Sequence, residues 1–222
     1  MILFAGIYLF MPTKRIAHQT RSPRERLRRV TRHLSVIRPR DLASAGLSRA
    51  ALRRLEHEGV VVRRARGLYV LADAKVSEHD TLTEVSARVP HGVICLLSAL
   101  HFHGLTTQNP AEVWMAIDHK ARTPVAPDLP LRIVRFSGLS RTAGIERHRI
   151  NGVTVRVYTA AKTVADCFKF RNKIGLEIAI EALREYVREH RGTIDELWRY
   201  TTVCRVSNVM RPYLESATAG QL

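Results

Sequence analysis

Apolar residues near the start of the chain recur at helical spacing and predict two short helices in succession. Leu27, Val30 and Leu34 lie three or four positions apart, with arginine on the other faces, and define the first helix. Pro39 opens the second helix and Leu42 turns inward, because proline is tolerated in the first turn of a helix. Both helices therefore present one apolar face to a common small core.

A third helix and a hairpin follow. Ser48 is a favourable N-cap for a helix over 49–58, and Gly59 occupies the position after its end, where glycine is preferred. The β-branched run 60–62 and the run 68–71 indicate two strands, joined by an arginine-rich turn that ends in glycine. Three helices followed by a hairpin form the outline of a winged helix-turn-helix.

The rest of the chain mixes helical and strand patterns. The clearest strand signal is ERHRINGVTVRVYT, where Asn151-Gly152 separates two alternating runs, as a type I′ hairpin requires. We expect further strands at 113–117 and 131–136, and helices at about 79–88, 93–102, 160–169, 174–190, 194–203 and 206–216. The sequence thus predicts an α+β fold: an N-terminal winged helix-turn-helix, then a mixed α/β domain with an antiparallel sheet and a helical C-terminus.

These patterns divide the chain into three parts. Residues 1–21 are an apolar and then disordered tail, 22–72 form the winged helix-turn-helix, and 79–217 form the second domain. The tail opens with ten apolar or small residues, which are too few to span a bilayer, so we expect no stable membrane association. Met11 as the true start is one interpretation of the tail; a weak membrane-surface anchor is the alternative.

Charge is concentrated in the first third of the chain. The whole chain carries a net charge of +16, and residues 1–72 hold 16 Lys/Arg against 4 Asp/Glu, a net of +12. The remaining residues are nearly balanced. Such asymmetry indicates a polyanion-binding domain joined to a domain with another task. The alternative is a solvated basic surface without a specific partner.

The predicted third helix carries the candidate base-reading residues. On its helical wheel, Arg49 and Arg53 lie opposite the leucines and in the leading half, which enters the major groove in a helix-turn-helix. The planar guanidinium can donate two hydrogen bonds to guanine. We expect Ser48 and Arg54 to hold phosphates. The complete candidate DNA-binding set is Arg40, Ser48, Arg49, Arg53, Arg54, His57, Arg64 and Arg66.

The predicted hairpin supplies a second cluster of positive charge. Arg64 and Arg66 lie at its tip, where a wing reaches the DNA backbone or the minor groove, and Arg40 opens the helix that crosses the backbone. Each phosphate contact makes binding more sensitive to salt. The alternative is a winged helix that binds another protein, with these arginines serving only solubility.

Cysteine and histidine spacing argues against a metal site or a disulfide framework. Cys95, Cys167 and Cys204 are far apart and lie in apolar contexts, which is typical of core thiols in a reducing compartment. His101 and His103 form a pair without an evident third ligand nearby. We therefore expect no metal and no cofactor.

Asp118 and Lys120 raise the alternative of an enzyme. They follow a predicted strand with the D-x-K spacing of some metal-dependent nucleases. Such a site needs a second carboxylate close by, because divalent ions prefer several oxygen ligands. Glu112 and Glu84 are the candidates, although neither has the usual flanking residues. No hydrolase, zinc-protease or phosphate-loop motif is present, which favours a binding protein.

Lys162 and Asp166 are spaced four residues apart on a predicted helix. An ion pair at that spacing stabilises an isolated helix by only about 0.2–0.5 kcal/mol. A structural helix start is one interpretation. The other is a turn that buttresses the sheet or forms a surface for a partner.

Three segments resemble the AbiEi-type antitoxins of type IV toxin–antitoxin systems. The first is RPRDLASAGLSRAALRRLEHEGVVVRRARGLYVL, which resembles the family's N-terminal winged helix and its Gly-x-Tyr exit strand. The second is CLLSALHFHGL, and the third is VRVYTAAKTVADCF with the downstream GLEIAIEAL, which resembles the family's Lys-Thr-x-x-Asp helix and the helix after it. The resemblance runs from about 27 to 215 and lies in the order and spacing of these segments.

The resemblance implies a bacterial DNA-binding antitoxin that is not an enzyme. Its N-terminal domain would bind inverted repeats in its own promoter as a transcriptional autorepressor, with paired copies on the DNA left open. Its C-terminal antitoxin domain, 79–217, would counter a cognate AbiEii-like nucleotidyltransferase toxin. The expected location is the cytoplasm. The alternative function is a DNA-targeted, metal-dependent nuclease with a winged-helix reader domain.

Overall fold

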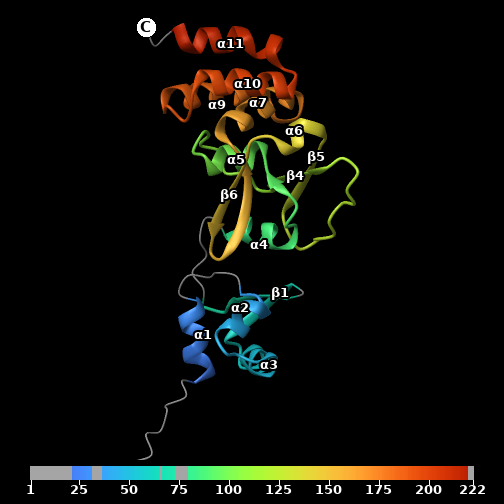
Figure 1. Cartoon of the computed structure of the whole chain (residues 1–222), viewed down its shortest axis with the longest axis vertical. Helices are drawn as coiled ribbons and strands as arrows, with labels where there is room; N and C mark the ends of the chain where they lie inside the picture. The colour runs from blue at the N-terminus through green and yellow to red at the C-terminus, as the bar shows by residue number, and fades with distance from the viewer. Residues whose placement is uncertain (1–21, 32–36, 66, 74–79, 220–222) are drawn as a thin grey trace, which may run out of the picture.

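The computed structural model describes residues 22–31, 37–65, 67–73 and 80–219, and their helices and strands fall into two parts (Figure 1). Each part has its own apolar core. One core lies among residues 27–71, and the other, among residues 82–214, consists of two apolar clusters. Both cores belong to an α+β fold in which the N-terminal helices and short sheet fit a winged helix. We refer to the two parts as the N-terminal unit and the C-terminal unit.

The N-terminal unit contains three helices and a two-stranded sheet. Its elements are α1 (Pro23–Thr31), α2 (Pro39–Ser44), α3 (Arg49–His57), β1 (Val61–Ala65) and β2 (Leu68–Leu71). Leu27 of α1, Leu42 of α2 and Leu55 of α3 are each at most 2% exposed and meet in one cluster. The helical spacing of leucines in the sequence therefore correctly predicts residues that form the core of this unit. Leu34 lies outside the described residues.

The hairpin is longer than the sequence predicts. Strand β1 runs from Val61 through Ala65, so Arg63 and Arg64 are strand residues and the antiparallel register shifts between Arg63 and Ala65. Ile37, which lies ahead of α2, exchanges two main-chain hydrogen bonds with Tyr69 of β2. This pairing joins the start of the helix-turn-helix to the hairpin, and the spacing of apolar residues does not reveal it.

The C-terminal unit contains one five-stranded mixed sheet. Its strands are β3 (Val93–Ile94), β4 (Val113–Asp118), β5 (Leu131–Phe136), β6 (Ile145–Ile150) and β7 (Val153–Tyr158), in the order β5-β4-β3-β7-β6. The β3–β4 and β6–β7 pairs are antiparallel, while β4–β5 and β3–β7 are parallel. Parallel pairing of β4 with β5 requires the long connection 119–130, which holds three prolines.

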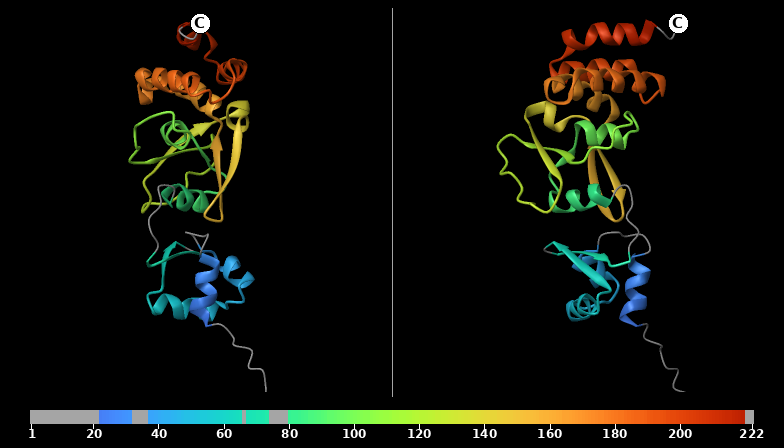
Figure 2. Two further views of the ribbon diagram at one scale, coloured as in Figure 1. Left: turned by 90° about the vertical axis from the view of Figure 1, so that its left-hand side faces the viewer. Right: turned by 180° about the vertical axis from the view of Figure 1, so that it is seen from behind.

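Helices cover both faces of this sheet and extend beyond it (Figure 2). The helices are α4 (Asp80–Arg88), α5 (Leu96–Phe102), α6 (Gly138–Thr142), α7 (Ala160–Lys169), α8 (Arg171–Ile174), α9 (Leu176–Arg188), α10 (Ile194–Cys204) and α11 (Ser207–Ala219). Met115 and Val155 face the cluster under α4, whereas Trp114 and Tyr158 face the cluster under α7. The alternation of side chains along β4 and β7 thus separates two apolar layers.

Two predicted helices begin differently in the structure. The apolar run from Val93 starts as the central strand β3, and helix begins only at Leu96. A short buried strand and a buried helix share the same continuous apolar pattern, so the spacing could not separate them. The predicted helix 174–190 is divided at Gly175, whose φ of 98° ends α8 before α9 begins.

The predicted hairpin at Asn151-Gly152 is confirmed. Both residues have positive φ, 50° and 76°, as a type I′ turn requires, and β6 pairs with β7 in regular antiparallel register.

Helix α7 begins at Ala160, and the Thr159 hydroxyl accepts a hydrogen bond from the main chain of Lys162, as expected for an N-cap. Within the described residues, no helix is long and apolar enough to cross a membrane.

Candidate nucleic-acid interface

Helix α3 has one buried and one charged face. Leu52 and Leu55 are at most 4% exposed, whereas Arg49, Arg53 and His57 are exposed on the other side. The Ser48 hydroxyl accepts a hydrogen bond from the main-chain N–H of Ala51 at 3.1 Å, so Ser48 caps the helix as predicted. The structure therefore brings the predicted base-reading arginines to one solvent-facing surface.

Arg54 is exposed but already has a partner. Its Nε lies 2.9 Å from Oε1 of Glu58, and Nη2 of Arg24 on α1 lies 3.0 Å from Oε2 of the same carboxylate. Hydrogen bonds from Arg54 and then from Arg24 lower the pKa of Glu58. A phosphate at Arg54 would compete with this carboxylate for the guanidinium, because an exposed ion pair is only weakly stabilising.

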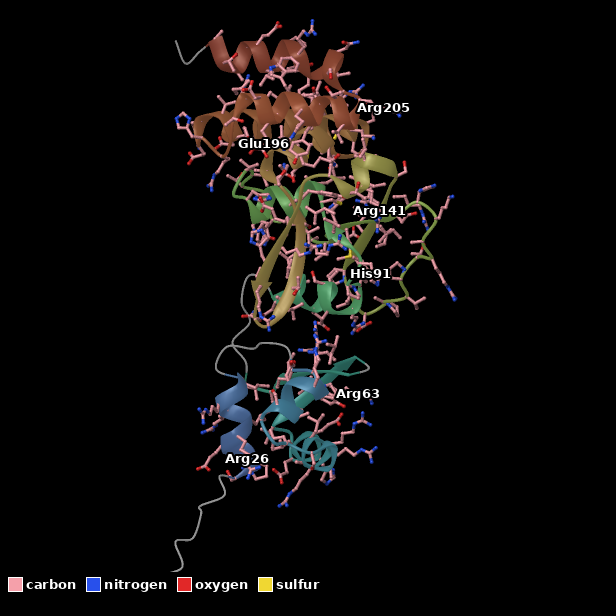
Figure 3. The ribbon with its side chains drawn as sticks, viewed as in Figure 1. Arg26, Arg63, His91, Arg141, Glu196 and Arg205 are labelled. Atoms are coloured by element: carbon pink, nitrogen blue, oxygen red, sulfur yellow. The ribbon has the colours of Figure 1, made fainter. Side chains whose placement is uncertain are left out.

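Helix α2 places Arg40 at the same unit's surface. Its side chain is 72% exposed, and its Nε lies 3.9 Å from Oδ1 of Asp41. The Arg26 side chain of α1, labelled in Figure 3, donates to the carbonyl of Gly46 in the turn between α2 and α3. The turn that positions α3 is thus braced from α1.

The hairpin presents Arg64 from strand β1. Its side chain is exposed, and its main-chain carbonyl accepts a hydrogen bond from Nη2 of Arg88 in the C-terminal unit at 2.7 Å. Arg66, the other predicted wing contact, lies outside the described residues. In the views of Figures 1 and 2, α3 and the hairpin lie on the side of the unit opposite α1.

The N-terminal unit is similar in sequence to a known protein family. Residues 25–72 match a family model described as "Transcriptional regulator, AbiEi antitoxin". The N-terminal unit is AbiEi-like. The match runs from within α1 to the end of the hairpin and supports an antitoxin or regulator role.

A solved structure extends the likeness in fold to most of the chain. The crystal structure of RV2827C protein from Mycobacterium tuberculosis has 16% sequence identity and a TM-score of 0.56, covering 87% of this chain and 76% of that chain. At this identity the likeness is one of fold alone. No curated protein matches the chain.

Outside the AbiEi-like unit, the carboxylates proposed for a nuclease lie apart. Glu112 immediately precedes strand β4 and Asp118 is its last residue, so extended chain separates these two residues by about 20 Å. Oδ2 of Asp118 lies 3.4 Å from Nε of Arg141 (Figure 3), and a hydrogen bond from the main chain of Lys120 lowers the pKa of Asp118. Across residues 22–31, 37–65, 67–73 and 80–219, no group of three or more His, Cys, Asp or Glu could hold a metal ion.

Lys162 and Asp166 form a buried ion pair in the C-terminal unit. Both side chains have zero exposure, and the Lys162 ammonium lies 2.5 Å from Oδ2 of Asp166 and 4.3 Å from the centre of the Tyr158 ring. The thiol of Cys204 donates to the other carboxylate oxygen at 3.2 Å. Complete burial supports the buttress interpretation and removes these two side chains from any partner surface.

The three thiols and His103 belong to the packing of this unit. Cys95, Cys167 and Cys204 are buried and free, as the sequence predicts. Nε2 of His103 lies 2.7 Å from the carbonyl of Tyr158, and burial lowers the pKa of this histidine. Arg88 and Asp128, which the sequence does not single out, pair within the C-terminal unit, and Arg88 also donates to the Arg64 carbonyl of the N-terminal unit. Because 40 positions separate Arg88 from Asp128, no local pattern predicts their pairing.

Proposed function

We propose that this chain is a DNA-binding antitoxin and transcriptional autorepressor of a type IV toxin–antitoxin operon. The supporting observation is that the AbiEi match coincides with a helix-turn-helix whose third helix exposes arginines. In this proposal residues 22–72 bind double-stranded DNA and 79–217 neutralise the toxin. The proposed place of action is the bacterial cytoplasm, where both the promoter and a reduced environment for three free thiols are found.

Arrangement of charge on α3 favours DNA as the partner of the N-terminal unit. Arg49 and Arg53 leave the helix on its solvent side, one turn apart, so both could enter one major groove. Ser48, Arg54, His57 and Arg40 are exposed in the same helix-turn-helix, and Arg64 is exposed on the hairpin. The arginines that would read bases are thus flanked by side chains that could hold phosphates.

DNA binding can be tested with the full chain and the promoter upstream of its own gene. We expect fluorescence anisotropy to show tighter binding to a duplex with the promoter inverted repeats than to a shuffled duplex. Affinity for both should fall steeply as salt rises, because phosphate contacts release counterions. Equal affinity for both duplexes at every salt concentration would contradict sequence-specific repression.

The antitoxin role is tested separately, by expression with the adjacent open reading frame. We expect that frame to encode a nucleotidyltransferase of the AbiEii class that slows growth when expressed alone. Co-expression of this chain should restore growth, and a chain with Arg49 and Arg53 replaced by alanine should still restore it. Failure of the intact chain to protect would contradict the antitoxin role without affecting the DNA-binding role.

A further inference from the structure

Arg88, at the end of α4, contacts both units at once. Its guanidinium binds the Asp128 carboxylate with two hydrogen bonds, Nη1 to Oδ1 at 2.6 Å and Nη2 to Oδ2 at 2.5 Å. Nη2 also donates to the carbonyl of Arg64 in strand β1 at 2.7 Å. Glu84, one turn earlier on α4, lies 3.5 Å from the same nitrogen. We call Arg88, Asp128 and the Arg64 carbonyl the clasp.

The clasp is partly shielded from water. The Arg88 side chain is 13% exposed, and hydrogen bonding to Asp128 raises its pKa while lowering that of Asp128. Leu68 of β2 packs beside it in a small apolar cluster with Val153 of the C-terminal unit. The hairpin is therefore held to the C-terminal unit by a charged contact and an apolar contact.

Asp128 belongs to a braced segment rather than a free loop. In residues 119–130, the Arg135 guanidinium donates to the carbonyls of His119 and Ala121 and to the Thr123 hydroxyl, at 2.8–2.9 Å. The connection between β4 and β5 lies on the same side of the molecule as α3 and the hairpin (Figures 1 and 2). The first half of the connection that carries Asp128 is thus held to the sheet of the C-terminal unit, and Asp128 lies three residues before β5.

We propose that Arg88 and Asp128 are positioning residues for DNA binding, which hold the β1–β2 hairpin so that its arginines meet the same duplex as α3. This inference rests on the proposed DNA-binding function. The held carbonyl belongs to Arg64 itself, and a fixed main chain reduces the conformational freedom lost when an arginine on the hairpin binds phosphate. The C-terminal unit therefore contributes to DNA affinity without a base contact of its own.

Asp128→Asn separates this proposal from simple electrostatics. The change removes one negative charge, so general attraction to DNA alone predicts tighter binding. The clasp predicts weaker binding, because an amide cannot replace the two-oxygen contact with Arg88 and the hairpin is released. Glu112→Gln is the matched control: it removes the same charge and breaks another exposed pair, Glu112 with Arg132 at 3.6 Å, outside the clasp.

The readout is affinity for a promoter duplex and for a shuffled duplex across a salt series, with the full chain. For Asp128→Asn we expect about 3- to 10-fold weaker binding to both duplexes and a salt slope reduced by about 1–2, as expected for loss of one or two phosphate contacts. Preference between the duplexes should not change, because α3 is untouched. Glu112→Gln should bind as tightly as wild type or slightly tighter, and Asp128→Glu should recover part of the loss.

Binding by Asp128→Asn that equals that of Glu112→Gln would overturn the proposal while leaving the DNA-binding function standing. Hydrogen exchange gives a readout that needs no DNA. Amides of 61–71 should exchange faster in Asp128→Asn than in Glu112→Gln, and amides of α3 should not. Equal exchange in the hairpin of both variants would overturn the clasp, whether or not the wild type binds DNA. Absence of DNA binding by the wild type would instead contradict the proposed function.

Discussion

At the scale of single residues, position on α3 separates arginines that the sequence presents as one basic cluster. Arg53 leaves the helix toward solvent, while Arg54 shares the Glu58 carboxylate with Arg24. The Arg53 guanidinium, in the leading half of the helix, is suited to hydrogen bonding with guanine. Arg54 would first have to leave the Glu58 carboxylate before it could bind DNA. The two neighbours are therefore expected to behave differently on substitution.

Arg53→Ala should reduce sequence preference. We expect the promoter duplex to lose about 1–3 kcal/mol of binding free energy relative to a shuffled duplex, the amount carried by one bidentate base contact. Arg28→Ala on α1 removes the same charge and should weaken binding to both duplexes equally. Competition shift assays measure both variants, and an unchanged preference in Arg53→Ala would exclude a base-reading role.

The buried pair in α7 gives a prediction about stability. Asp166→Ala should lower the free energy of unfolding by about 3–5 kcal/mol, because Lys162 would be left charged and unpaired in the core. Replacing both residues, Lys162→Met with Asp166→Leu, should cost much less, since no charge remains buried. Urea denaturation of the two variants measures the difference. A similar loss of unfolding free energy in both variants would show that the two side chains stabilise the core by packing rather than by their charges.

His103 predicts a pH dependence of stability. Burial holds its pKa below 6.5 in the folded protein, so the neutral ring is favoured there and the unfolded chain takes up the proton first. Stability should therefore be intact above pH 6.5 and decline as the pH falls through that value toward the folded pKa. His103→Gln should flatten this decline between pH 7.5 and 5 in chemical denaturation. Asp118 and Asp128, whose pKa values are lowered, titrate below this window.

At the scale of elements, the hairpin differs most from its sequence prediction. Arg63 and Arg64 lie in strand β1 rather than in a turn, at the point where the register with β2 shifts. Helix α3, by contrast, ends one residue before its predicted limit and has the faces that its leucine spacing predicts. A helix is stabilised by main-chain hydrogen bonds within its own segment. A strand extends as far as its pairing with the neighbouring strand, and the local sequence does not show where that pairing ends.

Substitutions in the hairpin should change affinity without changing preference. We expect Arg64→Ala and Arg66→Ala each to weaken binding to all duplexes and to lower the salt slope by about 0.9, the value of one phosphate contact. Arg188→Ala on α9, paired with Glu185 in the C-terminal unit, is the control and should leave the slope unchanged. A slope that stays at the wild-type value in both hairpin variants would rule out the backbone contact.

At the scale of the whole molecule, the two units have separate apolar cores and a small shared contact. The core of the C-terminal unit draws on the sheet and on α4 to α11, and the contact with the hairpin adds Leu68 and the clasp. Separate cores allow separate folding, since each unit buries its own apolar surface. The division of tasks between 22–72 and 79–217 remains a prediction that this arrangement makes testable.

A fragment of residues 73–222 should still neutralise the toxin. We expect it to restore growth on co-expression as the intact chain does, because it retains the whole sheet and the helices around it. The fragment should not repress a reporter driven by the promoter, since α3 is missing. Protection that requires the intact chain would show that the two tasks are not separable.

The sequence by itself determined the α+β class, the faces of α3, the type I′ turn at Asn151-Gly152 and the concentration of charge in the first third. The helix faces and the turn depend on residues a few positions apart, so periodicity, caps and turn preferences are enough to reveal them, and the charge is a matter of composition. Tertiary structure alone decided that Val93 begins a central strand, that Lys162 and Asp166 are fully buried, and that Arg88 joins Asp128 to the hairpin. These features depend on which distant segments meet, because burial and long-range pairing are properties of the packed chain.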